Sequence, residues 1–189
     1  YGITFSSKLT EIGGFDCDRE KEEVEKRLKE AYEKRDSLGG KIMCEVADVP
    51  AGLGEPVFNK LSALLAHAQM SIPSAKSFEL GDGLESCKRF GSEDMDKWEE
   101  GSGTLTNHSG GIQAGISNGE KIVFSVGFKP AASIGTVVCR NKSGELFEVK
   151  NEGRHDVAPV LRCGVVVEAM AALVIADLMK AMDNKTAIK

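Results

Sequence analysis

The sequence predicts an α+β protein that combines antiparallel hairpins with a central buried helix, as expected where antiparallel sheets pack around buried helices. Two observations support this fold class. The stretch 163–182 is apolar on most of its circumference, which is typical of a helix that is covered on both sides. Short runs that alternate apolar and polar residues follow one another, separated by turns rich in glycine and asparagine, and this pattern indicates hairpins.

Composition limits the function classes. The chain has 189 residues, of which 41% are hydrophobic and 28% charged, as in ordinary soluble domains. A net charge of −5 argues against nucleic-acid and membrane-surface partners, which need a basic face. The five cysteines include no CxxC pair, which favours reduced thiols in a cytoplasmic protein over disulfides or a metal site.

The first half of the chain alternates strands and helices. We expect an extended segment over 1–15, a surface helix within 18–40 that ends near Gly39, and a strand over 41–49 whose residues Ile42, Cys44 and Val46 face one side. A second helix should start at Pro56 and bury Val57 and Phe58 among the other apolar residues of a wide face. A strand over 74–80 follows, and the acidic stretch 84–103 is predicted to be a mobile surface loop or a lid.

Because Tyr1 lies within a predicted strand and no polar lead-in precedes it, we expect 1–189 to form a single domain that belongs to a longer chain.

The glycine-rich stretch 104–134 is the first candidate site. Asn118-Gly119 predicts a hairpin turn between a first arm that carries Gly110, Gly111 and Gly115 and a second arm over 122–128. Glycines in a strand indicate a bulge or the close approach of another group. That group could be a flat phosphorylated ligand anchored by Lys129, and the alternative is a glycine-tolerant edge hairpin. A second hairpin is predicted over 135–150.

Arg154-His155-Asp156 is the second candidate site, since three ionisable residues precede the buried last helix. Arg154 and the amino end of that helix favour an anion, and Asp156 could act as a base or accept a hydrogen bond. The alternative is an ion-pair cluster that caps the helix.

Several collinear motifs together resemble the chorismate synthase family. They cover most of the chain after residue 50: AGLGEPVF (51–58), AHAQMSIP (66–73), FELGDG (78–83), TNHSGGI (106–112), GISNG (115–119), Lys129-Pro130 with Ser133-Ile134, GRHD (153–156) and EAMAALV (168–174). The chain departs from the family pattern where glycine or proline is usual, at Ala114, Ser77, Val157 and Val165.

The resemblance implies a β-α-β sandwich, a homotetramer, and a lyase of the shikimate pathway. That enzyme eliminates phosphate from 5-enolpyruvylshikimate-3-phosphate in the 1,4-anti sense and depends on reduced FMN. The resemblance also implies that Asp156 lies near the reactive edge of the flavin. It places flavin contacts at nine positions: Pro73, Ser74, Ala114, Lys129, Pro130, Ala131, Ala132, Ser133 and Arg154.

The family's two acid/base histidines and its arginine-rich substrate loop belong to an N-terminal half that has no counterpart in these motifs. A second hypothesis is therefore a folding and oligomerisation module that binds flavin weakly and is not catalytic.

Overall fold

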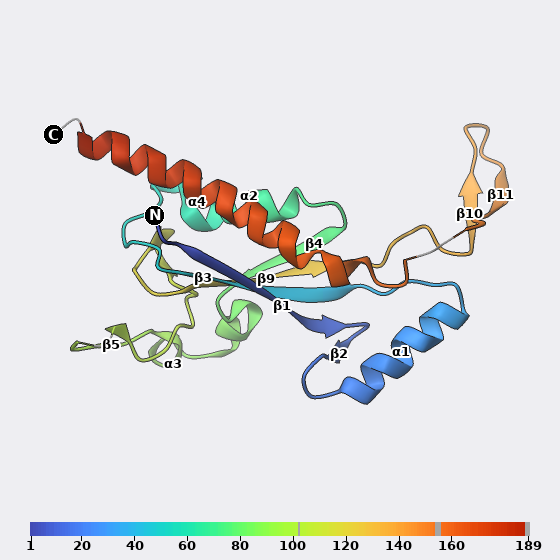
Figure 1. Cartoon of the computed structure of the whole chain (residues 1–189), viewed down its shortest axis with the longest axis horizontal. Helices are drawn as coiled ribbons and strands as arrows, with labels where there is room; N and C mark the ends of the chain where they lie inside the picture. The colour runs from blue at the N-terminus through green and yellow to red at the C-terminus, as the bar shows by residue number, and fades with distance from the viewer. Residues whose placement is uncertain (102, 154–155, 188–189) are drawn as a thin grey trace.

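The computed structural model describes residues 1–101, 103–153 and 156–187. A five-stranded antiparallel sheet, with the order β2-β1-β3-β9-β4, carries the helices α2 and α4 on one face (Figure 1). This confirms the α+β class and the antiparallel pairing. The described residues contain one large sheet, and their other strands form two-stranded sheets. The elements named so far, together with the first helix, are β1 (Thr4–Ile12), β2 (Phe15–Asp16), α1 (Lys21–Glu33), β3 (Gly40–Ala47), α2 (Leu61–Met70), β4 (Ala75–Leu80), β9 (Ile122–Phe128) and α4 (Gly164–Ala187).

The core lies between the sheet and the two helices. Ile42 pairs with Val126 and Cys44 pairs with Phe124, and these four side chains are at most 1% exposed. From α4, residues four apart complete the core: Val167, Ala171, Ile175 and Met179. The predicted inward face of the strand over 41–49 is thereby confirmed. Burial also raises the pKa of the Cys44 thiol to about 12, with Glu168 as a further cause.

The first helix is shorter than the predicted range 18–40. It stops because Arg35 adopts a left-handed φ of 54° and the Asp36 N–H donates back to the Ala31 carbonyl, the pattern of a Schellman motif. A left-handed non-glycine residue at this place is not visible in the sequence. Gly39, which was predicted to end the helix, lies beyond it and has another role.

The start of the second helix was also predicted wrongly. Val57 and Phe58 belong to a 3₁₀ turn (Val57–Asn59), and they are 64% and 87% exposed rather than buried. Val57 has a φ of 62°, which a helix does not allow and a β-branched residue rarely adopts. The regular helix therefore begins only at Leu61, whose N–H donates to the Gly115 carbonyl.

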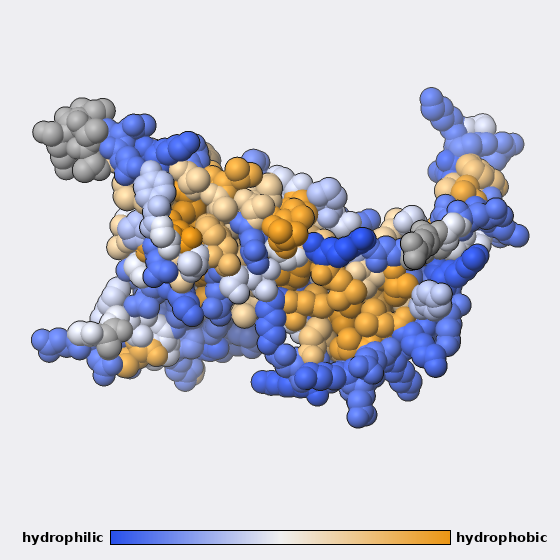
Figure 2. Space-filling view, in the orientation of Figure 1, coloured by the Kyte–Doolittle hydropathy of each residue, from blue (hydrophilic) through white to orange (hydrophobic). Residues whose placement is uncertain are grey.

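The last helix is packed on one side only within the described chain. Its inner side faces β1, β3 and α2, while Val165 and Leu173 on other sides are 70% and 66% exposed. Figure 2 shows apolar residues gathered along α4 and between α4 and α1, bordered by the hydrophilic residues of α1. We predicted a helix that is covered on both sides. Within the described chain, α4 is covered on one side only. No described helix has both the length and the hydrophobicity to cross a bilayer.

The hairpin predicted around Asn118-Gly119 is wrong. The glycine-rich arm forms its own small hairpin from β7 (Ile112–Gln113) and β8 (Ile116–Ser117), which turns at Ala114-Gly115. The second arm, β9, pairs instead with β3 and β4 in the sheet interior. Its alternate apolar residues need a covered face, and only the large sheet offers one.

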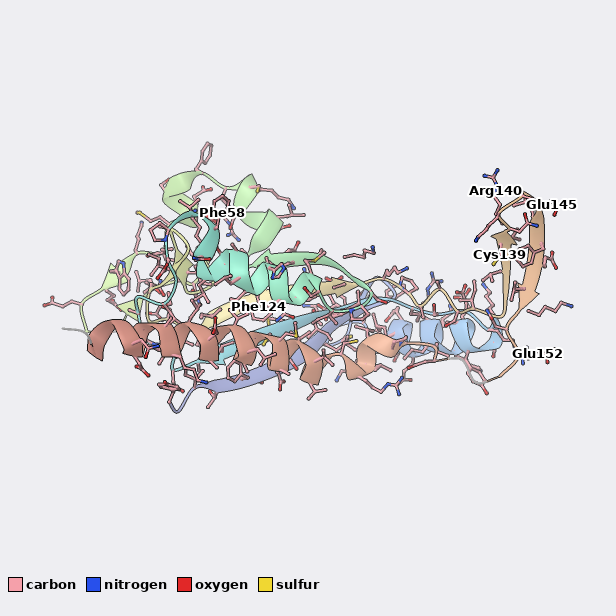
Figure 3. The ribbon with its side chains drawn as sticks, turned by 90° about the horizontal axis from the view of Figure 1, so that it is seen from above. Phe58, Phe124, Cys139, Arg140, Glu145 and Glu152 are labelled. Atoms are coloured by element: carbon pink, nitrogen blue, oxygen red, sulfur yellow. The ribbon has the colours of Figure 1, made fainter. Side chains whose placement is uncertain are left out.

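The second predicted hairpin is confirmed by β10 (Thr136–Arg140) and β11 (Leu146–Lys150). It projects from the body of the molecule, with Arg140 and Glu145 near its tip (Figure 3). The stretch 84–103 is less irregular than expected. Its elements are a 3₁₀ helix (Gly83–Lys88), α3 (Gly91–Asp94), β5 (Trp98–Glu99) and β6 (Gly103–Thr104), and a further 3₁₀ helix (Pro159–Arg162) precedes α4.

Candidate functional site

Most of the predicted flavin-binding residues lie at one end of the large sheet. The Lys129 N–H donates to the Ser74 carbonyl oxygen at 2.9 Å, just before β4 begins and just after β9 ends. This bond places Pro73-Ser74 beside Lys129-Pro130, although more than fifty residues separate them in the sequence. All four residues are exposed.

The segment 37–39 joins this end of the sheet to the stretch around Asp156. The Ser37 hydroxyl donates to the Ala131 carbonyl at 2.6 Å, and the Leu38 N–H donates to the Val157 carbonyl at 2.7 Å. Residues 129–131 and 156–157 thus share one neighbour. Sequence reasoning did not single out this segment, since its contacts are all long-range.

Gly39 allows the close approach on which this junction depends. A Cβ atom at this position would lie 2.3 Å from the Phe128 carbonyl oxygen and 3.1 Å from the carbonyl carbon of Lys129. Both are backbone atoms that cannot rotate away. Any side chain here would push the segment from the sheet and displace Lys129.

Asp156 has partners of its own in the chain. Its exposed carboxylate forms an ion pair with the Arg162 guanidinium and accepts a hydrogen bond from the Ala158 N–H at 3.2 Å. These contacts match the helix-capping alternative at the mouth of α4. Arg154 and His155 lie outside the described residues, so of the three ionisable residues predicted to form this site only Asp156 is described.

Ala114 is not brought to the other predicted residues. Gly115, its neighbour, contacts the first residue of α2, whereas Ser74 follows the last turn of that helix. With 10 residues, α2 is about 15 Å long, so Ala114 and Ser74 lie near opposite ends of it. Ala132 and Ser133 continue as an exposed loop after Ala131.

The glycines of the stretch 110–115 pack against the chain itself. A Cβ on Gly110 would lie 2.5 Å from the Gly81 nitrogen and from the Val123 carbonyl oxygen, and one on Gly111 would lie 2.4 Å from the Lys121 carbonyl oxygen. The group that approaches Gly110 and Gly111 closely is therefore backbone, whereas a Cβ on Gly115 would lie 2.4 Å from the Lys60 side chain. These contacts favour the alternative interpretation of this arm, a glycine-tolerant hairpin.

A cleft of about 650 Å³ lies between α1 and this end of the sheet. Its lining includes Lys129 and Pro130, together with Ser77, Gly127 and Gly39. Its volume is in the range of about 300–1,000 Å³ that ligand sites occupy. The cleft is the feature of the described chain best suited to hold a small molecule beside the predicted residues.

Comparison with protein families gives the family of the chain. The family model for chorismate synthase matches residues 5–180. The chain belongs to the chorismate synthase family. The resemblance seen in the motifs is thereby confirmed.

Individual chorismate synthases agree with this assignment. The enzyme of Schizosaccharomyces pombe is 46% identical over 167 residues, covering 85% of this chain and 42% of that protein. The enzyme of Lachnospira eligens is 43% identical over 209 residues, covering 98% of this chain and 57% of that protein. A crystal structure of chorismate synthase superposes with a TM-score of 0.74 at 29% identity, covering 94% of this chain and 57% of that one. The chain spans about half the length of the curated relatives it matches.

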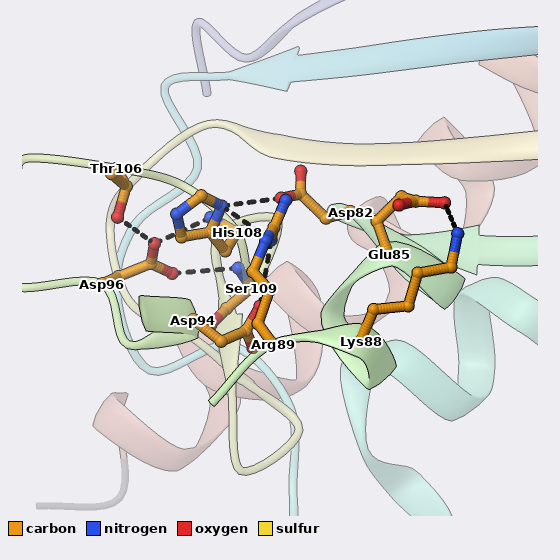
Figure 4. A network of polar contacts seen from close by, with 9 residues as sticks. All are labelled: Asp82, Glu85, Lys88, Arg89, Asp94, Asp96, Thr106, His108 and Ser109. Carbon is orange, nitrogen blue, oxygen red and sulfur yellow. Dashed lines mark hydrogen bonds and ion pairs between the residues drawn. The ribbon is translucent and has the colours of Figure 1, made fainter. Parts of the chain in front are cut away.

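A buried carboxylate, which sequence reasoning missed, organises the glycine-rich motif of this family member (Figure 4). Asp96, 4% exposed, accepts hydrogen bonds from the Thr106 hydroxyl at 2.7 Å and from the N–H groups of His108 at 2.7 Å and Ser109 at 2.9 Å. Burial raises the pKa of Asp96, but these hydrogen bonds outweigh it and hold the pKa below its usual value. In an acidic run, no sequence signal marks one aspartate as buried.

A second ion-pair cluster lies beside it. The His108 Nδ1 atom lies 2.6 Å from the Asp82 carboxylate, and Arg89 bonds to Asp82 at 2.5 Å and to Asp94 at 3.1 Å (Figure 4). Burial raises the pKa of Asp82, but bonds from Arg89 and His108 leave it below its usual value. Both clusters tie the stretch 84–103 to the glycine-rich motif, so this stretch is an anchored loop rather than a detached lid.

Proposed function

We propose that this chain forms the flavin-binding part of a chorismate synthase. Such an enzyme converts 5-enolpyruvylshikimate-3-phosphate to chorismate and phosphate by a 1,4-anti elimination that needs reduced FMN. Family membership supports the reaction class. The observation that supports the location of the site is a set of contacts around the segment 37–39. This segment bonds to Ala131 and to the stretch beside Asp156, and Ser74 bonds to Lys129.

The residues present fit a phosphorylated, flat cofactor. The cleft beside them has the volume of a ligand site, and Lys129 provides a cation on its lining. Pro73, Ser74 and residues 129–133 would hold the flavin, together with Arg154. Ala114 would contribute only if the ligand, or another part of the protein, reached the far end of α2. When bound, reduced FMN supplies electron density to the substrate as phosphate leaves.

The chain's own contribution to the chemistry centres on Asp156. An ionised carboxylate at this place can accept a hydrogen bond or a proton from a group bound beside it. The ion pair with Arg162 holds the Asp156 carboxylate at the mouth of α4. A neutral amide of the same shape would keep the packing and lose this capacity.

We also propose the family's sandwich architecture and homotetramer for the complete protein. The apolar side chains that α4 exposes, such as Val165 and Leu173, support a further covering layer.

A second candidate function is a folding and assembly module that binds flavin weakly. The exposure of Pro73, Ser74, Lys129 and Pro130 in this chain favours it, since half-covered ligands bind poorly.

Phosphate release from 5-enolpyruvylshikimate-3-phosphate, measured anaerobically with excess reduced FMN, separates the two candidates. We expect turnover by the complete enzyme, none by residues 1–189 alone, and a much larger loss of turnover than of flavin affinity in Asp156→Asn. Turnover within a fewfold of the parent in Asp156→Asn would reduce this residue to a helix cap. Failure of the complete enzyme to release phosphate would contradict the proposed function.

A further inference from the structure

The floor of the cleft is one row of residues that crosses four strands. The strand register pairs Glu11 with Lys41, Lys41 with Gly127, and Gly127 with Ser77, and all four residues line the cleft. The adjacent row contains the buried Ile42, which faces the opposite way because successive side chains in a strand alternate. The cleft therefore lies on the sheet face that α2 and α4 leave uncovered.

A β-bulge turns Lys76 toward this cleft. Ala75 pairs with Phe128 and Ser77 pairs with Gly127, so Lys76 is an extra residue in β4. In a regular strand, Lys76 and Ser77 would point to opposite faces. Here both line the same cleft, and re-aiming a side chain in this way is a common use of bulges beside binding sites.

The positive charge of the cleft is not neutralised at its β4–β9 end. Lys41 is paired with Glu79 at 2.5 Å, and the α1 cations on the cleft wall are paired with Glu30. Within the described ranges, neither Lys76 nor Lys129 forms an ion pair.

Two of the acidic groups on the wall, Glu11 and Glu30, do not offset these two lysines. Glu11, at the far end of the floor, lies three strand spacings from Ser77, or about 14 Å. That separation exceeds the Debye length of about 8 Å at physiological ionic strength. Glu30 is paired with two cations, whereas Asp36 accepts a hydrogen bond from the Ser37 N–H and keeps its negative charge.

We propose that Lys76, together with Lys129, binds the phosphate group of a phosphate monoester at this end of the cleft. The inference rests on the proposed function for the identity of the ligand, which is a flavin phosphate or a substrate phosphate. Gly127 keeps the place open, because a Cβ there would lie 2.3 Å from the Ser77 hydroxyl. A lysine ammonium bonds to a phosphate dianion as a compact point charge, without needing a fixed geometry.

The test compares Lys76→Ala and Lys76→Arg in the complete protein. Lys142→Ala, which removes an exposed lysine from the turn of the β10–β11 hairpin, is the matched control. Three ligands are titrated by fluorescence or calorimetry: FMN, riboflavin, which has the same ring but no phosphate, and phenyl phosphate, which has a phosphate but no flavin.

We expect Lys76→Ala to lower the affinity for at least one of the two phosphate ligands by about tenfold or more, because the loss of a charge-assisted hydrogen bond costs roughly 1.5–3 kcal/mol. Riboflavin binding should not change, and Lys76→Arg should restore most of the affinity. Loss for FMN would assign the flavin phosphate, and loss for phenyl phosphate alone would assign the substrate phosphate.

Two results would overturn the inference. One is that both phosphate ligands bind Lys76→Ala as they bind the parent, or bind neither protein. The other is an equal loss for riboflavin, which would mean that the substitution changed the shape of the cleft. If phenyl phosphate binding depends on Lys76 while no flavin binds at all, the inference holds and the proposed flavin function fails.

Discussion

The two faces of the large sheet are made by alternate residues of the same strands, yet they differ in every respect that matters for function. One face carries large apolar side chains such as Phe124 and Ile42, sealed beneath α2 and α4. The other carries small or polar residues such as Ser125, Gly127 and Ser77, and it ends in the cleft. Because the side-chain period of a strand is two, one strand can supply stability with one set of residues and a binding surface with the other.

This comparison predicts that stability and ligand binding can be changed separately by neighbouring substitutions. A change on the covered face should lower the free energy of unfolding and leave the affinity of the folded protein intact. A change on the open face should do the opposite.

Phe124→Ala should give the largest effect. The side chain is fully buried and its ring lies 5.4 Å from that of Phe78, so truncation should cost about 3–5 kcal/mol of unfolding free energy. Urea unfolding measures this loss. Ser125→Ala, the next residue on the open face, is the matched control and should change the unfolding free energy by less than about 0.5 kcal/mol. Similar losses in both variants would contradict the division between faces.

Asp96→Ala should cause the next largest loss of unfolding free energy. It leaves the part-buried N–H groups of His108 and Ser109 without their acceptor, which should cost about 3 kcal/mol at neutral pH, whereas Glu100→Ala in the same acidic stretch should cost little.

The contribution of Asp96 to the free energy of unfolding should decrease as the pH is lowered. Its pKa is lowered in the folded protein, so its stabilisation is complete above the unfolded pKa of about 3.9 and is lost as the pH falls through the folded pKa. Urea unfolding at pH 7 and near pH 3 should show the gap between parent and Asp96→Ala shrinking at the lower pH. A gap that grew on acidification would show that Asp96 is not held as an ionised acceptor.

Ala114→Gly should have a small effect of the opposite sign. Ala114 lies on the exposed turn between β7 and β8 with a φ of 51°, a conformation that costs an L-residue about 1–2 kcal/mol. Glycine relieves this strain, but it also raises the conformational entropy of the unfolded chain, which offsets part of the benefit. We therefore expect the free energy of unfolding to increase by up to about 1 kcal/mol, measured by thermal or urea unfolding. A loss of stability would mean that the turn does not hold this conformation in solution.

The sequence predicted what depends on local periodicity. Alternation identified the inward face of β3, and the apolar stretch identified α4. The errors lie where distant contacts decide. Arg35 ends α1 in a left-handed conformation, β9 leaves its neighbour in sequence to pair with β3, and Gly39 fits against a carbonyl ninety residues away.

The same reason explains the parts of the site that were missed. The bulge at Lys76 exists only in relation to the register of β9, and Asp96 is buried only because the stretch 106–109 folds over it. Neither feature can be predicted from the neighbouring residues in the sequence.

The most direct test of the account is the affinity of the complete protein for FMN when Lys129 is changed to alanine. Flavin fluorescence titration should show binding weakened about ten- to a hundredfold, as loss of a charge-assisted bond to a phosphate-bearing ligand implies, with unfolding free energy unchanged and Lys142→Ala like the parent. An unchanged dissociation constant in Lys129→Ala would show that the flavin does not bind at this end of the sheet.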